Sequence, residues 1–334
     1  MKWLKIIGGV IGALVLLFVV VAGVAKAKMD ASYFDGYDPS APLDPGVVDI
    51  EEKAGEAGKD LGRPTYVRTH LYFNGYRDDR VPTLLATPIG NKDRLPCVVF
   101  LHGIGQSKGF LDRIAEPFVL AGFAFVSFDQ LMQGERKLRD APYLDQAKAF
   151  RARPAHTVND TRRLIDYLET RDDIAPDRIY LTGASYGAIT GATAAALDER
   201  IKAVVLCYGG GNVPKMLEAR MVADEIRKRG PWMPVVKLIG WYLLSAADPL
   251  RYAGRIAPRP VFLQNGTDDG LIAADAARAL QEAVREPKKI KIYRGDHIGF
   301  DEDTVRTVLA DILEWLKEQD AKVVAAQPPV RPAA

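Results

Sequence analysis

The chain is poor in the residues that build metal and redox sites. Its 334 residues include only four histidines and two cysteines. No histidine stands in an H-E-x-x-H pattern and the cysteines form no C-x-x-C pair, so neither a metal nor another cofactor is expected. Cys97 and Cys207 each lie in an apolar, strand-like run, which predicts buried free thiols rather than a disulfide.

An excess of charge of one sign is also lacking. The chain has 45 basic and 43 acidic residues, for a net charge of +2. A nucleic-acid-binding surface needs a clustered basic face, so no nucleic-acid partner is expected. A hydrophobic share of 48% is ordinary for a globular protein with a large core.

Long hydrophobic runs are absent except at the N-terminus. The segment 6–24 is uncharged and lies between two pairs of lysines. Its length is sufficient to cross a bilayer core of ~30 Å. We expect residues 1–28 to anchor the protein in a membrane, with the remaining chain outside the cytoplasm. The alternatives are a signal peptide cleaved at Ala25-Lys26-Ala27, which would leave a secreted protein, and a buried helix.

The rest of the chain predicts one α/β domain at 61–320, joined to the anchor by a linker at 29–60. Alternating residues at 66–73 and 81–87 predict an antiparallel strand pair. Continuous apolar strands then alternate with helices, which is typical of a mostly parallel central sheet covered by helices on both faces. The tail at 321–334 is rich in alanine and proline and is expected to be disordered.

A helical insertion is expected at 213–247, before the strand at 261–264. It is too long for a simple crossover and carries Trp232 and Trp241. These residues fit two readings equally well: a lid over a site, or ordinary packing of a helix on the sheet.

The pentapeptide Gly183-Ala184-Ser185-Tyr186-Gly187 separates an apolar strand from a helix of small residues. This G-x-S-x-G context is typical of a nucleophile elbow, a sharp turn that lifts a serine hydroxyl clear of the sheet. Glycine is needed at positions 183 and 187 because a Cβ atom there would crowd the bend. The alternative is that Ser185 is only a polar turn residue.

A serine nucleophile needs a base and a carboxylate, and in this architecture they follow the serine in the order acid, then histidine. His297 is the histidine that follows the elbow, just after the last expected strand. The acid candidates are Asp268 and Asp269, after the strand before it. We predict Asp269 as the acid and expect Asp268 to accept turn N–H groups.

An oxyanion hole is expected from two backbone N–H groups, those of Tyr186 and Ile104. Ile104 lies in a loop after the strand at 97–101, next to Gly103, whose missing side chain lets the backbone turn inward. His102 is expected to brace this loop rather than to act as a second base. Two groups of polar residues receive structural roles. Asp129, Glu135 and Arg136 are expected to be salt-bridge partners rather than substrate contacts, and His156 and Asp160 are expected to be features of a helix start.

These motifs resemble the α/β-hydrolase superfamily, nearest to its dienelactone-hydrolase-like and acetyl-xylan-esterase-like members. The matching segments are Leu101-His102-Gly103-x-Gly105, the elbow, residues 260–269, Gly295-Asp296-His297 and the segment 248–252. The resemblance covers about residues 64–318. Dienelactone hydrolases proper carry cysteine at the elbow, so Ser185 points to general esterase chemistry, and Ala188 replaces a frequent second glycine.

The resemblance and the triad candidates together predict a serine hydrolase that cleaves carboxylic esters of small molecules through an acyl-enzyme intermediate. Two alternatives stay open: a peptidase or amidase of prolyl-oligopeptidase-like type, and a catalytically dead, membrane-tethered binding protein. The residues determine neither the acyl and alcohol groups of the substrate nor the oligomeric state.

Overall fold

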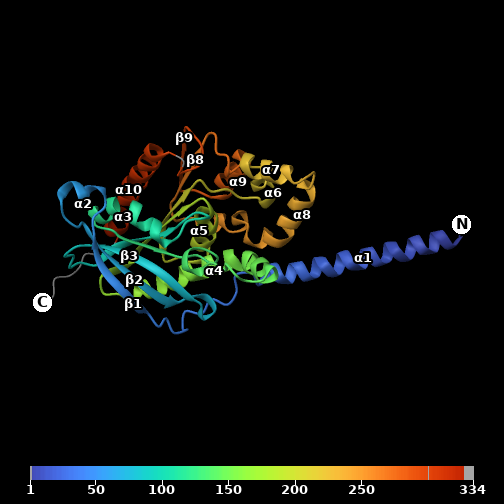
Figure 1. Ribbon diagram of the computed structural model, residues 1–334, viewed down its shortest axis with the longest axis horizontal. Coiled ribbons are helices and arrows are strands. Elements are labelled where there is room, and N and C mark those ends of the chain that lie inside the picture. The colour runs from blue at the N-terminus through green and yellow to red at the C-terminus, as the bar shows by residue number, and fades with distance from the viewer. Residues whose placement is uncertain (1, 300, 327–334) are drawn as a thin grey trace.

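Continuous apolar strands assemble into one sheet that helices cover on both sides (Figure 1). The computed structural model describes residues 2–299 and 301–326. Over these residues the sheet has nine strands in the order β1-β2-β3-β5-β4-β6-β7-β8-β9. The strands are β1 (Gly46–Lys53), β2 (Tyr66–Asn74), β3 (Arg80–Pro88), β4 (Leu95–Leu101), β5 (Ala124–Phe128), β6 (Ile174–Ala184), β7 (Ile201–Cys207), β8 (Val261–Gly266) and β9 (Lys288–Tyr293).

The sheet changes from antiparallel to parallel at β5. Strands β1, β2 and β3 pair antiparallel, as do β3 and β5. From β5 through β4, β6, β7 and β8 to β9 every pair is parallel. The expected parallel sheet and its antiparallel opening pair, β2 and β3, are therefore confirmed. Strand β1 lies inside the segment 29–60 and extends the sheet by one strand.

Five of the helices form the two layers on the sheet, and the others lie outside these layers. The α-helices of the described residues are α1 (Lys2–Ala31), α2 (Glu56–Leu61), α3 (Leu111–Leu120), α4 (Tyr143–Glu169), α5 (Tyr186–Leu197), α6 (Val213–Met216), α7 (Arg220–Lys228), α8 (Met233–Leu244), α9 (Ala274–Ala283) and α10 (Glu302–Ala325). Buried residues of α3 and α10 share one apolar cluster with the strands, and those of α4, α5 and α9 share the other. Every residue of β4 is buried, because a strand with a helix layer on each face has no side in water.

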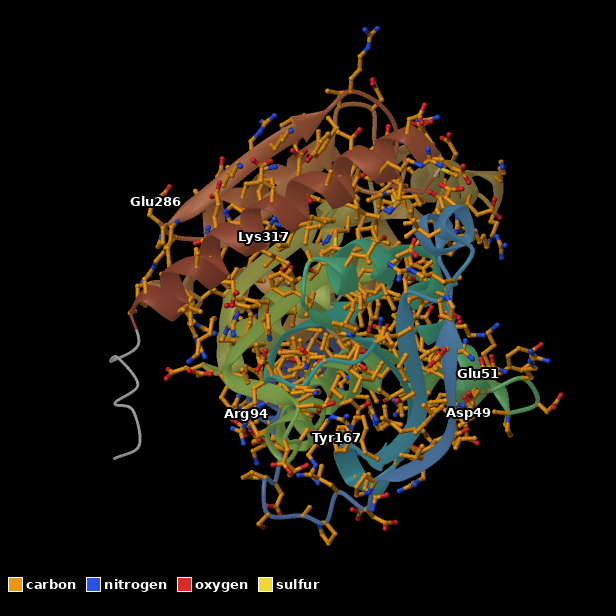
Figure 2. All side chains as sticks on the ribbon, turned by 90° about the vertical axis from the view of Figure 1, so that its left-hand side faces the viewer. Asp49, Glu51, Arg94, Tyr167, Glu286 and Lys317 are labelled. Atoms are coloured by element: carbon orange, nitrogen blue, oxygen red, sulfur yellow. The ribbon has the colours of Figure 1, made fainter. Side chains whose placement is uncertain are left out.

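Both edges of the sheet carry charge, which disfavours pairing with another chain. Edge strand β1 carries the half-buried Asp49 and the exposed Glu51 (Figure 2), and Glu51 forms an ion pair with Arg68 of β2 at 2.9 Å. At the opposite edge, β9 carries three lysines, Lys288, Lys289 and Lys291. Strands β4, β6 and β7 lie in the centre of the sheet, away from both charged edges.

The start of α4 differs from the expectation. The helix begins at Tyr143, so His156 and Asp160 lie in its middle, and their expected role at a helix start was wrong. The Asp160 carboxylate is fully buried and accepts hydrogen bonds from the N–H of Tyr76, at 2.7 Å, and from Arg136 Nη1, at 2.8 Å. Tertiary partners, rather than the helix terminus, therefore satisfy this carboxylate.

The salt bridges expected of Asp129, Glu135 and Arg136 are confirmed. Lys108 Nζ pairs with Asp129 at 3.2 Å and also with Glu135, and Arg136 pairs with Asp160. At the C-terminus, α10 extends to Ala325, into the segment expected to be disordered. Residues 327–334 of that segment lie outside the described residues.

We expect Arg136→Met to destabilise the fold strongly, because it leaves the buried Asp160 carboxylate without its cation. Loss of one partner of a buried ion pair costs about 3–5 kcal/mol, which lowers Tm by roughly 10 °C in a domain of this size. The control is Arg94→Met, since Arg94 is well exposed and its distance to Asp172 is 3.8 Å; its loss should cost less than about 1 kcal/mol. Thermal unfolding of the detergent-solubilised chain, followed by near-UV circular dichroism, measures both. Equal Tm values for the two variants would contradict the prediction.

Candidate active site

The candidate nucleophile stands at a sharp turn between β6 and α5. Ser185 has φ 56° and ψ −117°, a backbone conformation that is strained for any residue except glycine. Its N–H donates to the carbonyl of Cys207 at the end of β7, at 2.8 Å, and its own carbonyl accepts from the N–H of Ala188, at 2.9 Å. The turn is thus held from the neighbouring strand and from the first turn of α5.

The two elbow glycines allow the backbone to pack without side chains. A Cβ atom at Gly187 would lie far inside the van der Waals radius of the Leu101 carbonyl oxygen at the end of β4. A Cβ atom at Gly183 would collide in the same way with the carbonyl of Gly187. The requirement for glycine at both positions therefore comes from close backbone approach, which the sequence predicted for the bend.

The candidate acid and base are hydrogen-bonded to each other. Asp269, after β8, and His297, after β9, meet with Asp269 Oδ2 at 2.8 Å from His297 Nδ1, and both side chains are about 95% buried. A carboxylate only accepts, so Nδ1 carries the proton and the other ring nitrogen, Nε2, is left as an acceptor. This tautomer is the one that a general base requires.

The two neighbouring aspartates have different surroundings. Asp269 Oδ1 accepts from the N–H groups of Leu271 and Ile272, each at 2.8 Å, which holds the carboxylate toward the imidazole. Asp268 is exposed and accepts from the hydroxyl of Thr267 at 2.7 Å. The expectation that Asp268 accepts the turn N–H groups was therefore wrong. Asp269 accepts them, because its side chain points inward whereas that of Asp268 points to solvent.

Asp296, to which the sequence assigned no role, joins the acid loop to the base loop. Its Oδ1 accepts from the N–H groups of Gly270 and His297, both at 2.7 Å, and Arg220 of α7 reaches its Oδ2 at 3.2 Å. These interactions, led by the hydrogen bond from Gly270, lower the pKa of the Asp296 carboxyl. The carboxylate thus stays ionised near neutral pH and holds the two loops at a fixed separation.

The loop after β4 offers one unpaired N–H beside the elbow. A Cβ atom at Gly103 would lie 3.3 Å from Ser185 Cβ, so this loop directly adjoins the candidate nucleophile. The N–H of Gly103 donates to Gln106 Oε1 at 3.0 Å, and that of Gly105 donates to Gln133 Oε1 at 2.7 Å. Within the described residues, the N–H of Ile104 between them finds no acceptor.

The N–H of Tyr186 likewise has no acceptor among the described residues. It belongs to the first residue of α5, where backbone N–H groups lack partners within the helix and attract negative charge. Two donors are therefore available near Ser185. Sequence reasoning missed both glutamines. Gln133 binds a loop 28 positions away and carries no local signal, whereas Gln106 lies in the same loop as Gly103.

His102 lies away from the Asp269–His297 pair and is completely buried. Its Nδ1 lies 3.0 Å from the carbonyl of Gly103, and its own carbonyl accepts from Gln130 Nε2 at 2.7 Å. Burial lowers the pKa of the imidazole, so it stays neutral. These contacts support the bracing role expected for His102.

Tyr208 and Arg153 pack against residues of the candidate site, and the sequence analysis assigned neither of them a role. The buried ring of Tyr208 meets the imidazole of His297 edge to face, with centroids 5.6 Å apart. The guanidinium of Arg153 lies 4.2 Å from the ring centroid of Tyr186, and burial lowers the pKa of this arginine. Both contacts restrict the orientation of residues at the elbow and in the base loop, and both require the assembled fold.

The structure does not show every expected contact. Among the described residues, no hydrogen bond joins Ser185 Oγ to His297. The elbow and the acid–base pair nevertheless lie at the same end of the sheet, because each follows the carboxyl end of a parallel strand. Such bonds often form only when substrate is bound. The same residues contain no cluster of three or more histidine, cysteine, aspartate or glutamate side chains arranged to hold a metal ion.

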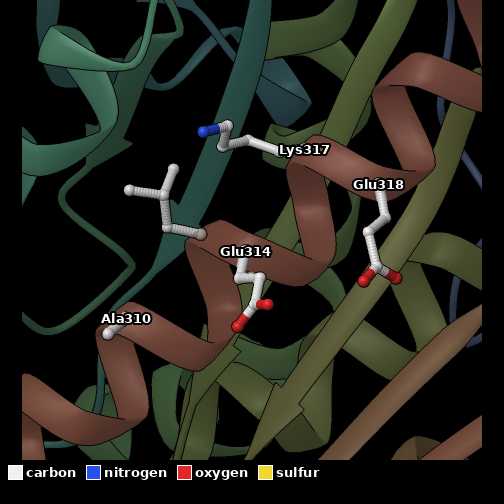
Figure 3. Close-up of a pocket in the computed structure, with 5 residues that line it drawn as sticks. Ala310, Glu314, Lys317 and Glu318 are labelled. Atoms are coloured by element: carbon white, nitrogen blue, oxygen red, sulfur yellow. The ribbon is translucent and has the colours of Figure 1, made fainter.

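A depression of about 530 Å³ lies elsewhere, on the outer face of α10 (Figure 3). Ala310, Leu313, Glu314, Lys317 and Glu318 line it, and all of them belong to that one helix. It contains neither the elbow nor the acid and base loops, so we do not regard it as the site.

Comparison with known proteins identifies the family. The model of the dienelactone hydrolase family matches residues 81–320, which include the elbow and both partner loops. The chain belongs to the dienelactone hydrolase family. Esterase YjfP of Escherichia coli is 24% identical over 217 residues, which cover 64% of this chain and 84% of that protein.

Solved structures agree with this family in fold. An acetyl xylan esterase from Paenibacillus sp. R4 superposes with a TM-score of 0.67 at 18% identity, covering 86% of this chain and 94% of that one. An acylaminoacyl peptidase from Pyrococcus horikoshii gives a TM-score of 0.61 at 15% identity over 81% of this chain, but only 44% of the peptidase is covered. This member of the dienelactone hydrolase family therefore has the α/β-hydrolase fold and is a hydrolase with esterase relatives.

We expect Gly187→Ala to disrupt the elbow, because the added methyl group collides with backbone rather than with a movable side chain. Overpacking of this kind should cost about 3 kcal/mol or more and reduce the yield of folded protein. Gly109→Ala is the matched control, since its Cβ atom would meet only Ser107 Oγ, at an ordinary 3.5 Å. Soluble yield and Tm report the difference; a Gly187→Ala variant as stable as Gly109→Ala would contradict the role given to Gly187.

Proposed function

We propose that the protein is a serine hydrolase of carboxylic esters, with Ser185 as nucleophile, His297 as general base and Asp269 as the carboxylate that orients it. The observation that carries the proposal is the buried 2.8 Å hydrogen bond between Asp269 and His297 Nδ1, which lies at the carboxyl end of the parallel strands, as the strained Ser185 does. Strain at a serine between strand and helix is the conformation that exposes its hydroxyl.

The reaction proceeds in two steps. His297 Nε2 removes the hydroxyl proton as Ser185 Oγ attacks the ester carbonyl carbon, and the resulting imidazolium gives that proton to the leaving alcohol. The N–H groups of Ile104 and Tyr186 stabilise the negative charge that develops on the carbonyl oxygen. Water then attacks the acyl-enzyme with the same base, releasing the carboxylic acid and restoring the serine.

A peptidase or amidase is the second candidate, because the Pyrococcus peptidase shares the fold. Amide cleavage needs the same nucleophile but stronger protonation of the leaving amine. Rates on p-nitrophenyl esters and on aminoacyl p-nitroanilides separate the two candidates. We expect a preference for the esters, and faster turnover of the anilides would favour the peptidase.

We also propose that α1 anchors the protein in a membrane. The segment Ile11–Ala31 is apolar and long enough to span a bilayer, and only 6% of its most apolar stretch is covered by the domain. Figure 1 shows α1 projecting from the domain as a long isolated helix. A helix packed into a soluble core would instead bury its apolar face.

We expect Ser185→Ala to lower kcat/KM for p-nitrophenyl acetate by about 10⁴-fold or more, since no other group supplies the attacking oxygen. The control is Ser40→Ala, because Ser40 is exposed and bonds only within its own loop, to Asp38. A fluorophosphonate probe should label the native chain and the Ser40→Ala variant but not Ser185→Ala. Undiminished turnover by Ser185→Ala would refute the proposed nucleophile, and an unlabelled native chain would favour the catalytically dead binding protein.

The adjacent aspartates offer a matched pair of variants. Asp269→Asn should lower kcat by about 10⁴-fold, because an amide NH₂ facing His297 favours the wrong tautomer of the imidazole. Asp268→Asn should change kcat by less than about threefold, since that carboxylate is exposed and bonds to Thr267. Steady-state kinetics on one ester measure both. A larger loss for Asp268→Asn would reassign the acid.

A further inference from the structure

Helix α8 presents an apolar stripe that nothing in the described chain covers. None of its residues is fully buried. Val235, Leu238 and Ile239 recur at spacings of three and four positions, so they lie along one side of the helix. Trp232, just before the helix, and Trp241, near its end, border this side, and all five residues have exposed fractions from 44% to 63%. A continuous apolar stripe of this kind marks a contact surface rather than a face that water solvates.

The C-terminal end of α1, residues 26–31, is bound to the end of α8; we call this part of α1 its root. Lys26 is buried and donates from Nζ to Ser245 Oγ, at 2.6 Å, and to the carbonyl of Tyr242, at 3.1 Å. Its ammonium group also lies 4.9 Å from the ring centroid of Trp241. Asp30 pairs with Lys26 at 2.8 Å. These bonds fix α1 against α8, so α8 lies where α1 leaves the domain (Figure 1).

A second surface near this root is also apolar. Tyr33, just after α1, donates from its hydroxyl to the carbonyl of Arg151 in α4. The first turns of α4 expose Tyr143, Leu144 and Phe150. The root of α1 is therefore flanked by exposed apolar side chains of two helices, α8 and α4.

The segment that leads into α8 is basic. Arg227, Lys228 and Arg229, at the end of α7, have side chains between 68% and 78% exposed, and they share two carboxylates, those of Asp224 and Glu225, in surface ion pairs. From position 220 to position 237 the chain has five basic and two acidic residues. An exposed apolar stripe containing tryptophan, next to basic residues, is the combination that binds the interface of an anionic bilayer.

We propose that α8 lies in the headgroup region of an anionic phospholipid bilayer, the same bilayer that α1 spans. The inference rests on the proposed membrane anchor. The start of α7 contacts the acid and base loops through the hydrogen bond from Met221 N–H to the Gly270 carbonyl, at 2.8 Å, and through the ion pair of Arg220 with Asp296. Seating α8 in the bilayer thus places the candidate site beside the lipid surface, where esters dissolved in the membrane can enter.

The test uses the four tryptophans of the full chain, Trp3, Trp232, Trp241 and Trp315. Variants that keep one tryptophan, with the others changed to phenylalanine, are reconstituted in nanodiscs that contain phosphatidylglycerol and lipids brominated at different depths. We expect Trp241 to be quenched most by bromine close to the headgroups. Trp315, which is 5% exposed in the domain core, is the control and should not be quenched.

The outcomes separate the two proposals. Quenching of Trp241 no greater than that of Trp315, while Trp3 in α1 is quenched, would overturn the seating of α8 but leave the anchor intact; α8 would then face water or a protein partner. Lack of quenching at Trp3 as well would overturn the anchor. Hydrolysis of p-nitrophenyl acetate by the same samples reports folding and the proposed chemistry independently of both.

A pair of substitutions tests the stripe itself. Leu238→Asp in the chain that keeps only Trp241 should reduce its quenching at least twofold, because a carboxylate opposes insertion. Val324→Asp in α10, also an exposed apolar position, should leave the quenching unchanged. Replacing phosphatidylglycerol by phosphatidylcholine should likewise weaken the quenching of Trp241. Equal quenching with both lipids would overturn the preference for an anionic surface.

Discussion

The close approach of the elbow backbone to the end of β4 is the constraint on which the candidate site depends. Gly187 lies so near the Leu101 carbonyl that no side chain fits between them. This contact lets the chain leave β6, reverse at Ser185 and enter α5 within a few residues. It also brings the loop after β4 to the elbow, so that Gly103 adjoins Ser185. One steric condition thus shapes the turn at the serine and brings the loop after β4 beside it.

Hydrogen bonds hold the acid loop, the base loop and the loop after β4 in place. Asp296 accepts N–H groups from both the acid loop and the base loop, and Asp269 accepts from its own turn before it meets His297. Gln106 and Gln133 occupy the N–H groups on either side of Ile104. Among the residues that the structure describes, the N–H groups of Ile104 and Tyr186 have no protein acceptor, and these are the two donors that the proposed reaction uses.

One region connects the apolar helix α1 with the loops of the candidate site. Lys26 joins the apolar helix α1 to α8, and α7 joins that region to the loops of Asp269 and His297. The insertion between β7 and β8 therefore contacts both α1 and the base loop. Asp248 closes it by accepting N–H groups from Asn212 and Val213, at 3.1 and 3.0 Å, so that the two ends of the insertion lie together.

Local chemistry was sufficient to predict the fold class, the elbow glycines and the order of Ser185, Asp269 and His297, because strand pattern, backbone sterics and chain order are properties of neighbouring residues. The tertiary structure alone decided the rest: that Asp269 also accepts the turn N–H groups expected of Asp268, that Tyr208 packs on the imidazole, and that Asp160 lies mid-helix with Arg136. A turn points two adjacent carboxylates in different directions, and a buried charge takes its partner from distant segments, so these pairings exist only once the chain is folded.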